Sequence, residues 1–160
     1  MGLAAVCSLA GAASASSLRL TSTEVAVVKL LNQSRAQYGL RALHVRTSLC
    51  RAARAHSRDM IRKGFFSHSS FNGESPAARV RRCGYALKGA LWYTGEVIAY
   101  GTGPAGTPQA IVKGWLRSKA HRAILLDPRW RDVGVGRARG SFLGCTGATV
   151  FTVDVGRRIH

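Results

Sequence analysis

The stretch GWLRSKAHRAILLDPRWRDVGVG, residues 114–136, changes from a helical period to a strand period. Its beginning belongs to a segment that starts at Thr107 and carries Ile111 and Trp115 at helical spacing. Its end, WRDVGVG, alternates apolar residues with polar or small ones, as a half-buried strand does. The run ATVFTVDV, residues 148–155, alternates in the same way. The sequence therefore predicts two antiparallel strands beside a helix that Trp115 anchors to the sheet.

The flanking segments predict further helices and one more strand. Ser75, followed by a proline, is a typical helix start, and Gly39 and Gly64 stand where left-handed C-caps end helices. His56 lies on the apolar stripe of its helix, which predicts a hydrogen-bonded core histidine. TGEVIAYG, residues 94–101, is expected to be a strand. The expected helices are 24–38, 48–63, 76–83, 109–118 and 120–126. The first of them follows Thr23.

The composition fits one globular domain. The 160 residues are expected to form a linker over 16–22 and a domain over 23–158. Twenty-four basic residues face seven acidic ones, which gives a formal net charge of +17. This excess favours either a solvated basic surface or an anionic partner: nucleic acid, anionic lipid or a charged cell wall. No nucleic-acid recognition motif accompanies the charge, so nucleic acid is the weakest of these partners.

The N-terminal run MGLAAVCSLAGAASASS is rich in small and apolar residues and contains an A-x-A cleavage pattern. It predicts a signal peptide over residues 1–15, and hence a secreted or extracytoplasmic protein. No later stretch predicts a transmembrane segment. After cleavage Cys50, Cys83 and Cys145 remain. They permit one disulfide in any of three pairings and leave one thiol over.

Glu96 differs from the other carboxylates because it stands between a glycine and an apolar run. A carboxylate at such a place points into the sheet or into a cleft and needs partners. Asp132 and Asp154, by contrast, are expected on the polar phase of their strands. His68 and His121 are candidate partners of Glu96. Two imidazoles and a carboxylate form an open zinc site when water supplies the fourth ligand.

Known catalytic motifs are missing from the sequence. It contains no G-x-S-x-G nucleophile elbow and no H-E-x-x-H zinc motif. GTGPAG, residues 101–106, matches the glycine pattern of a dinucleotide-binding loop, with Asp127 at a suitable distance. Too little of the chain follows Asp127 to complete a doubly wound sheet, so this match does not indicate a dinucleotide site.

The order and spacing of the motifs resemble the CAP superfamily, which comprises cysteine-rich secretory proteins, antigen 5 allergens and plant pathogenesis-related proteins, and especially its short bacterial branch. The matching motifs lie between Val25 and Val155: LLNQSRAQYGLRAL, AARAHSRDM, FFSH, RRCGY, TGEVIAYG, GWLRSKAHRAILLDPRWRDVGVG and TVDVG. The resemblance implies an α+β fold, a three-layer α-β-α sandwich with a small antiparallel sheet.

The resemblance also implies a central cleft lined by two histidines and one or two acidic residues. By motif match these are His68 in FFSH, Glu96 in TGEV and His121 in KAHR. The same three residues are the tentative ligands of a divalent cation such as zinc. Val97 replaces the family's usual asparagine, and Ser118 stands where animal and plant members carry a second acidic residue. A four-residue metal centre is therefore incomplete in this chain.

One function and two alternatives follow. The chain is expected to be a secreted, non-enzymatic, monomeric domain that binds a lipid-like or anionic cell-envelope ligand through the histidine- and glutamate-lined cleft and the basic surface. The first alternative is a metal-dependent hydrolase that uses a zinc-bound water in the same cleft. The second is a basic nucleic-acid-binding protein. The sequence assigns no catalytic residue.

Overall fold

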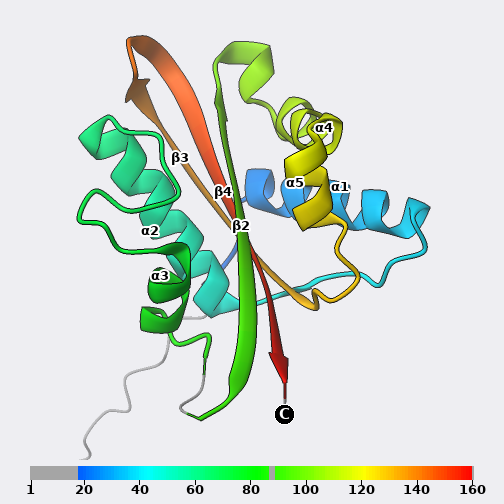
Figure 1. Cartoon of the computed structure of the whole chain (residues 1–160). Coiled ribbons are helices and arrows are strands. Elements are labelled where there is room, and N and C mark those ends of the chain that lie inside the picture. The colour runs from blue at the N-terminus through cyan, green and yellow to red at the C-terminus, as the bar shows by residue number, and fades with distance from the viewer. Residues whose placement is uncertain (1–17, 87–88, 160) are drawn as a thin grey trace, which may run out of the picture.

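A four-stranded sheet lies between two layers of helices in the computed structural model, which describes residues 18–86 and 89–159 (Figure 1). One layer consists of α2 (Thr47–Lys63) and α3 (Pro76–Arg82), and the other of α1 (Ser22–Gln37), α4 (Pro108–Arg117) and α5 (Lys119–Leu125). This arrangement confirms the expected α+β fold with three layers. The expected signal peptide, residues 1–15, lies outside the described residues.

The sheet has the strand order β1-β3-β4-β2, so β2 lies at one edge. The strands are β1 (His44–Val45), β2 (Leu91–Gly101), β3 (Asp132–Phe142) and β4 (Cys145–Ile159). As expected, β4 pairs antiparallel with β3. It also pairs antiparallel with β2, whereas the short β1 runs parallel to β3. Within the described part of the chain, β2 has a strand neighbour on one side only, and the candidate site forms at this edge.

The β3–β4 hairpin is longer than the sequence pattern predicts. The sequence pattern predicts strands over WRDVGVG and residues 148–155, which leaves GSFLGCTG, residues 140–147, as the expected connection. Most of this segment is strand, and only Leu143 and Gly144 lie between β3 and β4. Both residues have positive φ, 47° and 81°, as a two-residue turn that follows the twist of the strands requires. Because leucine rarely adopts a left-handed conformation, residue type alone does not predict this turn.

Successive residues of β3 face opposite sides of the sheet. Val133 and Val135 face α1, α4 and α5, where they join an extensive apolar cluster. Gly134 and Gly136 face α2, and a Cβ atom at either position would overlap the backbone of that helix. Helix α2 therefore lies directly on the sheet, and the two glycines permit this close approach.

Trp115 fastens α4 to the edge strand, as the sequence predicts. Its side chain is buried, and its Nε1 donates a hydrogen bond to the carbonyl oxygen of Ile98 on β2 over 3.1 Å. Thr107 caps the same helix by accepting a hydrogen bond from the backbone N–H of Ala110. The indole thus combines a large buried apolar surface with a satisfied donor, which fixes its orientation.

The start of α1 differs from the expected one. Thr21, not Thr23, is the N-cap, and its hydroxyl accepts a hydrogen bond from the Glu24 backbone N–H. The Glu24 carboxylate in turn accepts one from the Thr21 backbone N–H over 2.7 Å, which completes a capping box. The end of α2 agrees with the sequence, because Gly64 caps it with a φ of 65°.

The glycine pattern at residues 101–106 belongs to a tight turn. It covers the last residue of β2 and the short 3₁₀ helix η1 (Gly103–Gly106). A Cβ atom on Gly101 would overlap the backbone of Ala105, and one on Gly106 would overlap the backbone of Gly101. These glycines serve close backbone packing, consistent with rejecting a dinucleotide site.

The structure shows the surroundings of two aspartates and three cysteines that the sequence singles out. Asp132 and Asp154 lie on the polar phase of their strands, as expected, but this phase faces the α2–α3 layer and both side chains are buried. Asp132 accepts hydrogen bonds from Tyr85 Oη over 2.8 Å and from the Arg46 guanidinium over 2.7 Å. The cysteines of the described residues are free: buried Cys50, half-buried Cys83 and exposed Cys145.

Candidate functional site

Glu96 on β2 and Asp154 on β4 lie directly opposite each other in the antiparallel register. Both are buried on the face that α2 and α3 cover, at 6% and 1% exposure. Neither oxygen of Asp154 has a hydrogen-bond donor among the described residues. Burial, and then the charge of Glu96, raise the pKa of Asp154 well above its usual range. The surroundings of Asp154 therefore favour its protonated, neutral form.

The carboxylate of Glu96 is bonded at both oxygens. His68 Nδ1 lies 2.8 Å from Oε1, and Arg79 Nη2 donates to Oε2 over 2.6 Å. Because an ionised carboxylate only accepts hydrogen bonds, His68 carries a proton on Nδ1 in this pair. The guanidinium of Arg79 compensates the buried negative charge of Glu96.

Arg79 also connects α3 to the loop that carries His68. Its guanidinium donates to the carbonyl oxygens of His68 and Glu74, over 2.7 and 3.0 Å, and to the hydroxyl of Ser70 over 2.9 Å. The side chain of Arg79 is 2% exposed. A buried guanidinium with four hydrogen bonds holds the loop in one position, and this position brings His68 to Glu96.

His56 on α2 supports the same loop. Its Nε2 lies 2.8 Å from the carbonyl oxygen of Ser67 and 4.0 Å from Oε1 of Glu96. Burial lowers the pKa of His56, so the ring is neutral and donates its Nε2 proton to the Ser67 carbonyl. The expected core histidine is confirmed, and it has a second role as a support for the site.

His121 lies on α5, in the opposite helix layer. It borders a cavity of about 300 Å³ beside the edge strand, with Ile98, Tyr100, Trp115 and Ser118 among the other lining residues. Burial lowers the pKa of His121, and the charge of the nearby His68 lowers it further. In the described part of the chain, no hydrogen bond or ion pair joins His121 to His68 or Glu96.

The structure thus bonds His68 to Glu96, whereas His121 lines a cavity in the opposite helix layer. Sequence reasoning missed two members of the cluster, Arg79 and Asp154. The motifs TGEV and TVDV carry a signal for Asp154, because antiparallel pairing of the two strands sets their acidic residues opposite each other. No sequence signal separates Arg79 from the other arginines of its helix, since only tertiary packing buries it.

The polar cluster does not fit a zinc ion. Among residues 18–86 and 89–159, no three histidine, cysteine or acidic side chains are arranged to hold a metal. Both oxygens of Glu96 are engaged by His68 and Arg79, and Nδ1 of His68 is engaged by Glu96. A cation at Glu96 would also meet the positive charge of Arg79. The expected ligands His68, Glu96 and His121 therefore do not fit a shared metal in this arrangement.

The three layers and the histidines at the edge strand define an α-β-α sandwich domain with a cleft beside its outer strand. The chain belongs to the cysteine-rich secretory protein (CAP) family, whose family model matches residues 28–154. The resemblance found in the sequence motifs is thereby confirmed.

Two relatives come from Bacillus subtilis. The uncharacterized protein YkwD is 38% identical over 113 residues, which cover 71% of this chain and 41% of YkwD. The uncharacterized membrane protein YlbC is 34% identical over 118 residues, which cover 72% of this chain and 32% of YlbC. The chain therefore spans less than half the length of these relatives.

Solved structures share the fold. An extracellular protein containing an SCP domain from Bacillus anthracis matches with a TM-score of 0.70 at 25% identity, over 88% of this chain and 45% of that chain. An outer surface protein from Borrelia burgdorferi also has a TM-score of 0.70, at 19% identity, over 87% of this chain and 97% of that chain. The second likeness shows the fold alone.

Proposed function

We propose that this chain is a non-enzymatic ligand-binding domain that acts outside the cytoplasm and holds an anionic polymer of the cell envelope at its histidine-lined cleft. The observation that carries the proposal is that Glu96 is buried and that His68 and Arg79 each hold one of its oxygens. A general base must lie within hydrogen-bond reach of the substrate, and the Glu96 side chain is only 2% exposed. Glu96 has instead the contacts of a structural carboxylate that positions His68.

The imidazole of His68 is suited to contact a ligand. Its side chain is 54% exposed although Nδ1 is bonded to buried Glu96. The ring is thus fixed on one side and open to solvent on the other. His121 borders the cavity beside the edge strand from α5. His121 can donate a hydrogen bond to an anionic group from a neutral ring, whereas His68, whose Nδ1 is bonded to Glu96, donates through Nε2 as an imidazolium. Because Glu96 already holds the His68 ring, binding costs little side-chain freedom there.

The helix layer next to His68 supplies positive charge. Glu74 pairs with Arg82, and Asp59 pairs with Arg62 and Lys63. The layer has further exposed arginines without a carboxylate partner among the described residues, namely Arg51, Arg58 and Arg81. Uncompensated charges of one sign attract a polyanion over about a Debye length. This supports an anionic polymer rather than a neutral ligand.

Two observations support a location outside the cytoplasm. The related Bacillus anthracis protein is described as extracellular, and the N-terminal residues of this chain have the pattern of a signal peptide. Among the helices of the described residues, none is long and apolar enough to cross a membrane.

Cosedimentation with purified Bacillus subtilis cell walls tests the proposal. We expect the full chain to sediment with intact walls and to be released by high salt. Removal of the phosphate-rich wall polymers should abolish sedimentation. The variant Arg51→Gln/Arg58→Gln/Arg81→Gln and the variant His68→Ala/His121→Ala should both bind more weakly. His44→Ala, at an exposed histidine on β1, is the matched control and should bind as the wild type does.

Three results would contradict the proposal. Equal sedimentation with stripped walls would exclude the polymer as the ligand. Binding to anionic phospholipid vesicles but not to walls would assign the basic surface to lipid. Release of soluble wall fragments that depends on Glu96 would show that the domain is a hydrolase.

A further inference from the structure

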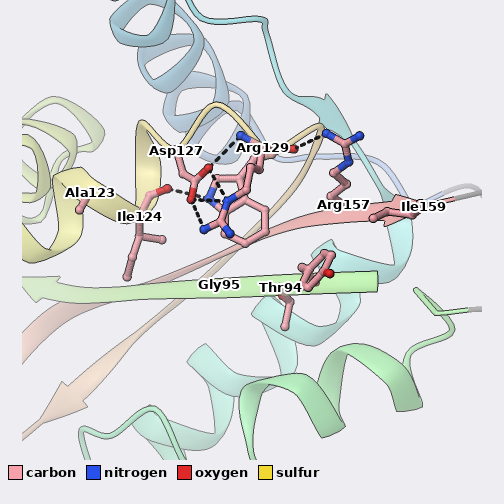
Figure 2. A pocket seen from close by; sticks show the side chains of 10 residues that line it. Thr94, Gly95, Ala123, Ile124, Asp127, Arg129, Arg157 and Ile159 are labelled. Atoms are coloured by element: carbon pink, nitrogen blue, oxygen red, sulfur yellow. Dashed lines mark hydrogen bonds and ion pairs between the residues drawn. The ribbon is translucent and has the colours of Figure 1, made fainter. Parts of the chain in front are cut away.

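A second cavity, of about 670 Å³, lies on the sheet face opposite Glu96, between β2, β4 and the end of α5 (Figure 2). The first half of β2 and the last residues of β4 form one side. Helix α5 and the loop that leads to β3 form the other. The cavity shares no lining residue with the cleft at His121. Its volume lies within the range of small-molecule pockets.

The walls of this cavity are mainly apolar. Tyr93, Ile124 and Ile159 contribute side chains to the lining. Nε1 of Trp130 donates to the carbonyl oxygen of Ile124 over 2.7 Å, and the hydroxyl of Thr94 donates to a β4 carbonyl oxygen over 2.9 Å. Because these polar atoms are satisfied within the protein, the body of a ligand would meet mostly apolar surface.

Arg157 supplies the one uncompensated charge of the lining. Asp127 and Arg129 neutralise each other through three hydrogen bonds of 2.6–3.0 Å (Figure 2). Arg157 has no carboxylate partner among the described residues and donates only a 3.4 Å hydrogen bond to the carbonyl oxygen of Arg129. It is directly opposite Tyr93 in the sheet register. A single cation thus stands beside an apolar cavity.

We propose that this cavity binds a small monocarboxylate with an apolar body. The carboxylate pairs with Arg157, and the body lies between Tyr93 and Ile124. One guanidinium matches one carboxylate in a bidentate pair. The single net charge favours a monoanion over the polyanion proposed for the cleft. This site goes beyond the proposed function and does not depend on it.

Calorimetric titration of the full chain with octanoate tests the site. We expect octanoate to bind more tightly than 1-octanol, and octylamine to bind least. Arg157→Gln should weaken octanoate binding by roughly tenfold to a hundredfold, the loss typical of a charge-assisted hydrogen bond, and should leave 1-octanol binding unchanged. Arg81→Gln removes the same charge from an exposed position on α3 and should leave octanoate binding unchanged.

A second pair of variants tests the cavity itself. Ala123 lines the cavity from an exposed position on α5, so Ala123→Phe should fill the space without disturbing the core and should abolish octanoate binding. Ala120→Phe, also exposed on α5 but outside the cavity, is the control. Absence of octanoate binding by the wild type, equal binding of all three probes, or full binding by Ala123→Phe would overturn the proposal. Wall sedimentation of Arg157→Gln should be normal, so this site and the proposed function can fail separately.

Discussion

Arg79 and Glu96 form an ion pair in which each side chain is 2% exposed, and the same guanidinium holds the loop that carries His68. The pair therefore couples the stability of the domain to the geometry of its cleft. Breaking it would leave a charge in a place that water does not reach, and would release the loop at the same time.

Replacement of Arg79 by alanine should lower the free energy of unfolding by about 3–5 kcal/mol, because the Glu96 charge is left without a partner. Arg81→Ala, at an exposed position of the same helix, should change it by less than about 0.5 kcal/mol. Urea unfolding followed by circular dichroism measures both variants. Similar effects of the two substitutions would contradict the structural role of Arg79.

Asp154 should make the domain less stable as the pH rises. Its pKa in the folded state is raised by burial and by Glu96, so its contribution to stability is fully present below the unfolded pKa and is lost as pH rises through the raised folded pKa. Asp154→Asn resembles the neutral acid and should flatten this part of the profile. Urea unfolding at a series of pH values above about pH 4 compares the two proteins. An unchanged slope in the variant would show that Asp154 is not the titrating group.

The glycines under α2 should not tolerate a side chain. Gly136→Ala sets a Cβ atom against the α2 backbone and should destabilise the protein more strongly than an ordinary surface substitution or prevent folding. Gly114→Ala is the control, because a Cβ atom on this α4 residue meets nothing within 4 Å. It should stabilise the domain by about 0.5–1 kcal/mol through helix propensity. Thermal unfolding distinguishes the two, and a stable Gly136→Ala variant would show that α2 can move away from the sheet.

Trp115→Ala should cost about 3–5 kcal/mol, since it removes a large buried side chain. Trp115→Phe retains most of the apolar area but loses the hydrogen bond to Ile98, so it should cost less. Denaturant titration gives both values. An unchanged melting temperature for Trp115→Ala would mean that α4 does not depend on this anchor.

The signal-peptide prediction can be checked on exported protein. Expression of the full chain in Bacillus subtilis should yield a product in the medium that begins after residue 15. N-terminal sequencing identifies the start. A secreted product that began at Met1, or retention of all the protein in the cytoplasm, would contradict the prediction.

Features that depend on neighbouring residues could be predicted from the sequence. Ser75 and Thr107 cap their helices and Gly64 ends α2, as their local chemistry indicates. The spacing of Trp115 from Ile111 predicts that the indole lies in the core, and this is confirmed. In each case the interaction lies within a few positions along the chain, so the residue types are sufficient.

Features that depend on packing between distant segments could not be predicted. Asp132 follows the polar phase of its strand, yet Tyr85 covers it from the α2–α3 layer. Helix α3 also contains Arg81 and Arg82, but Arg79 is the arginine that the loop encloses. The sequence names His68 and His121 as candidate partners of Glu96, but not that His68 alone forms the bond, because that depends on the course of the loop.

The loop between α2 and α3 is held by Arg79 largely through backbone carbonyl oxygens, those of His68 and Glu74. Carbonyl groups are present whatever side chains a loop carries. An outward side chain such as that of Ser69 can therefore be exchanged without loosening the attachment. A domain built in this way can acquire a new ligand preference through substitutions in one surface segment. The sheet, the helices and the arginine that holds the segment keep their sequence and position.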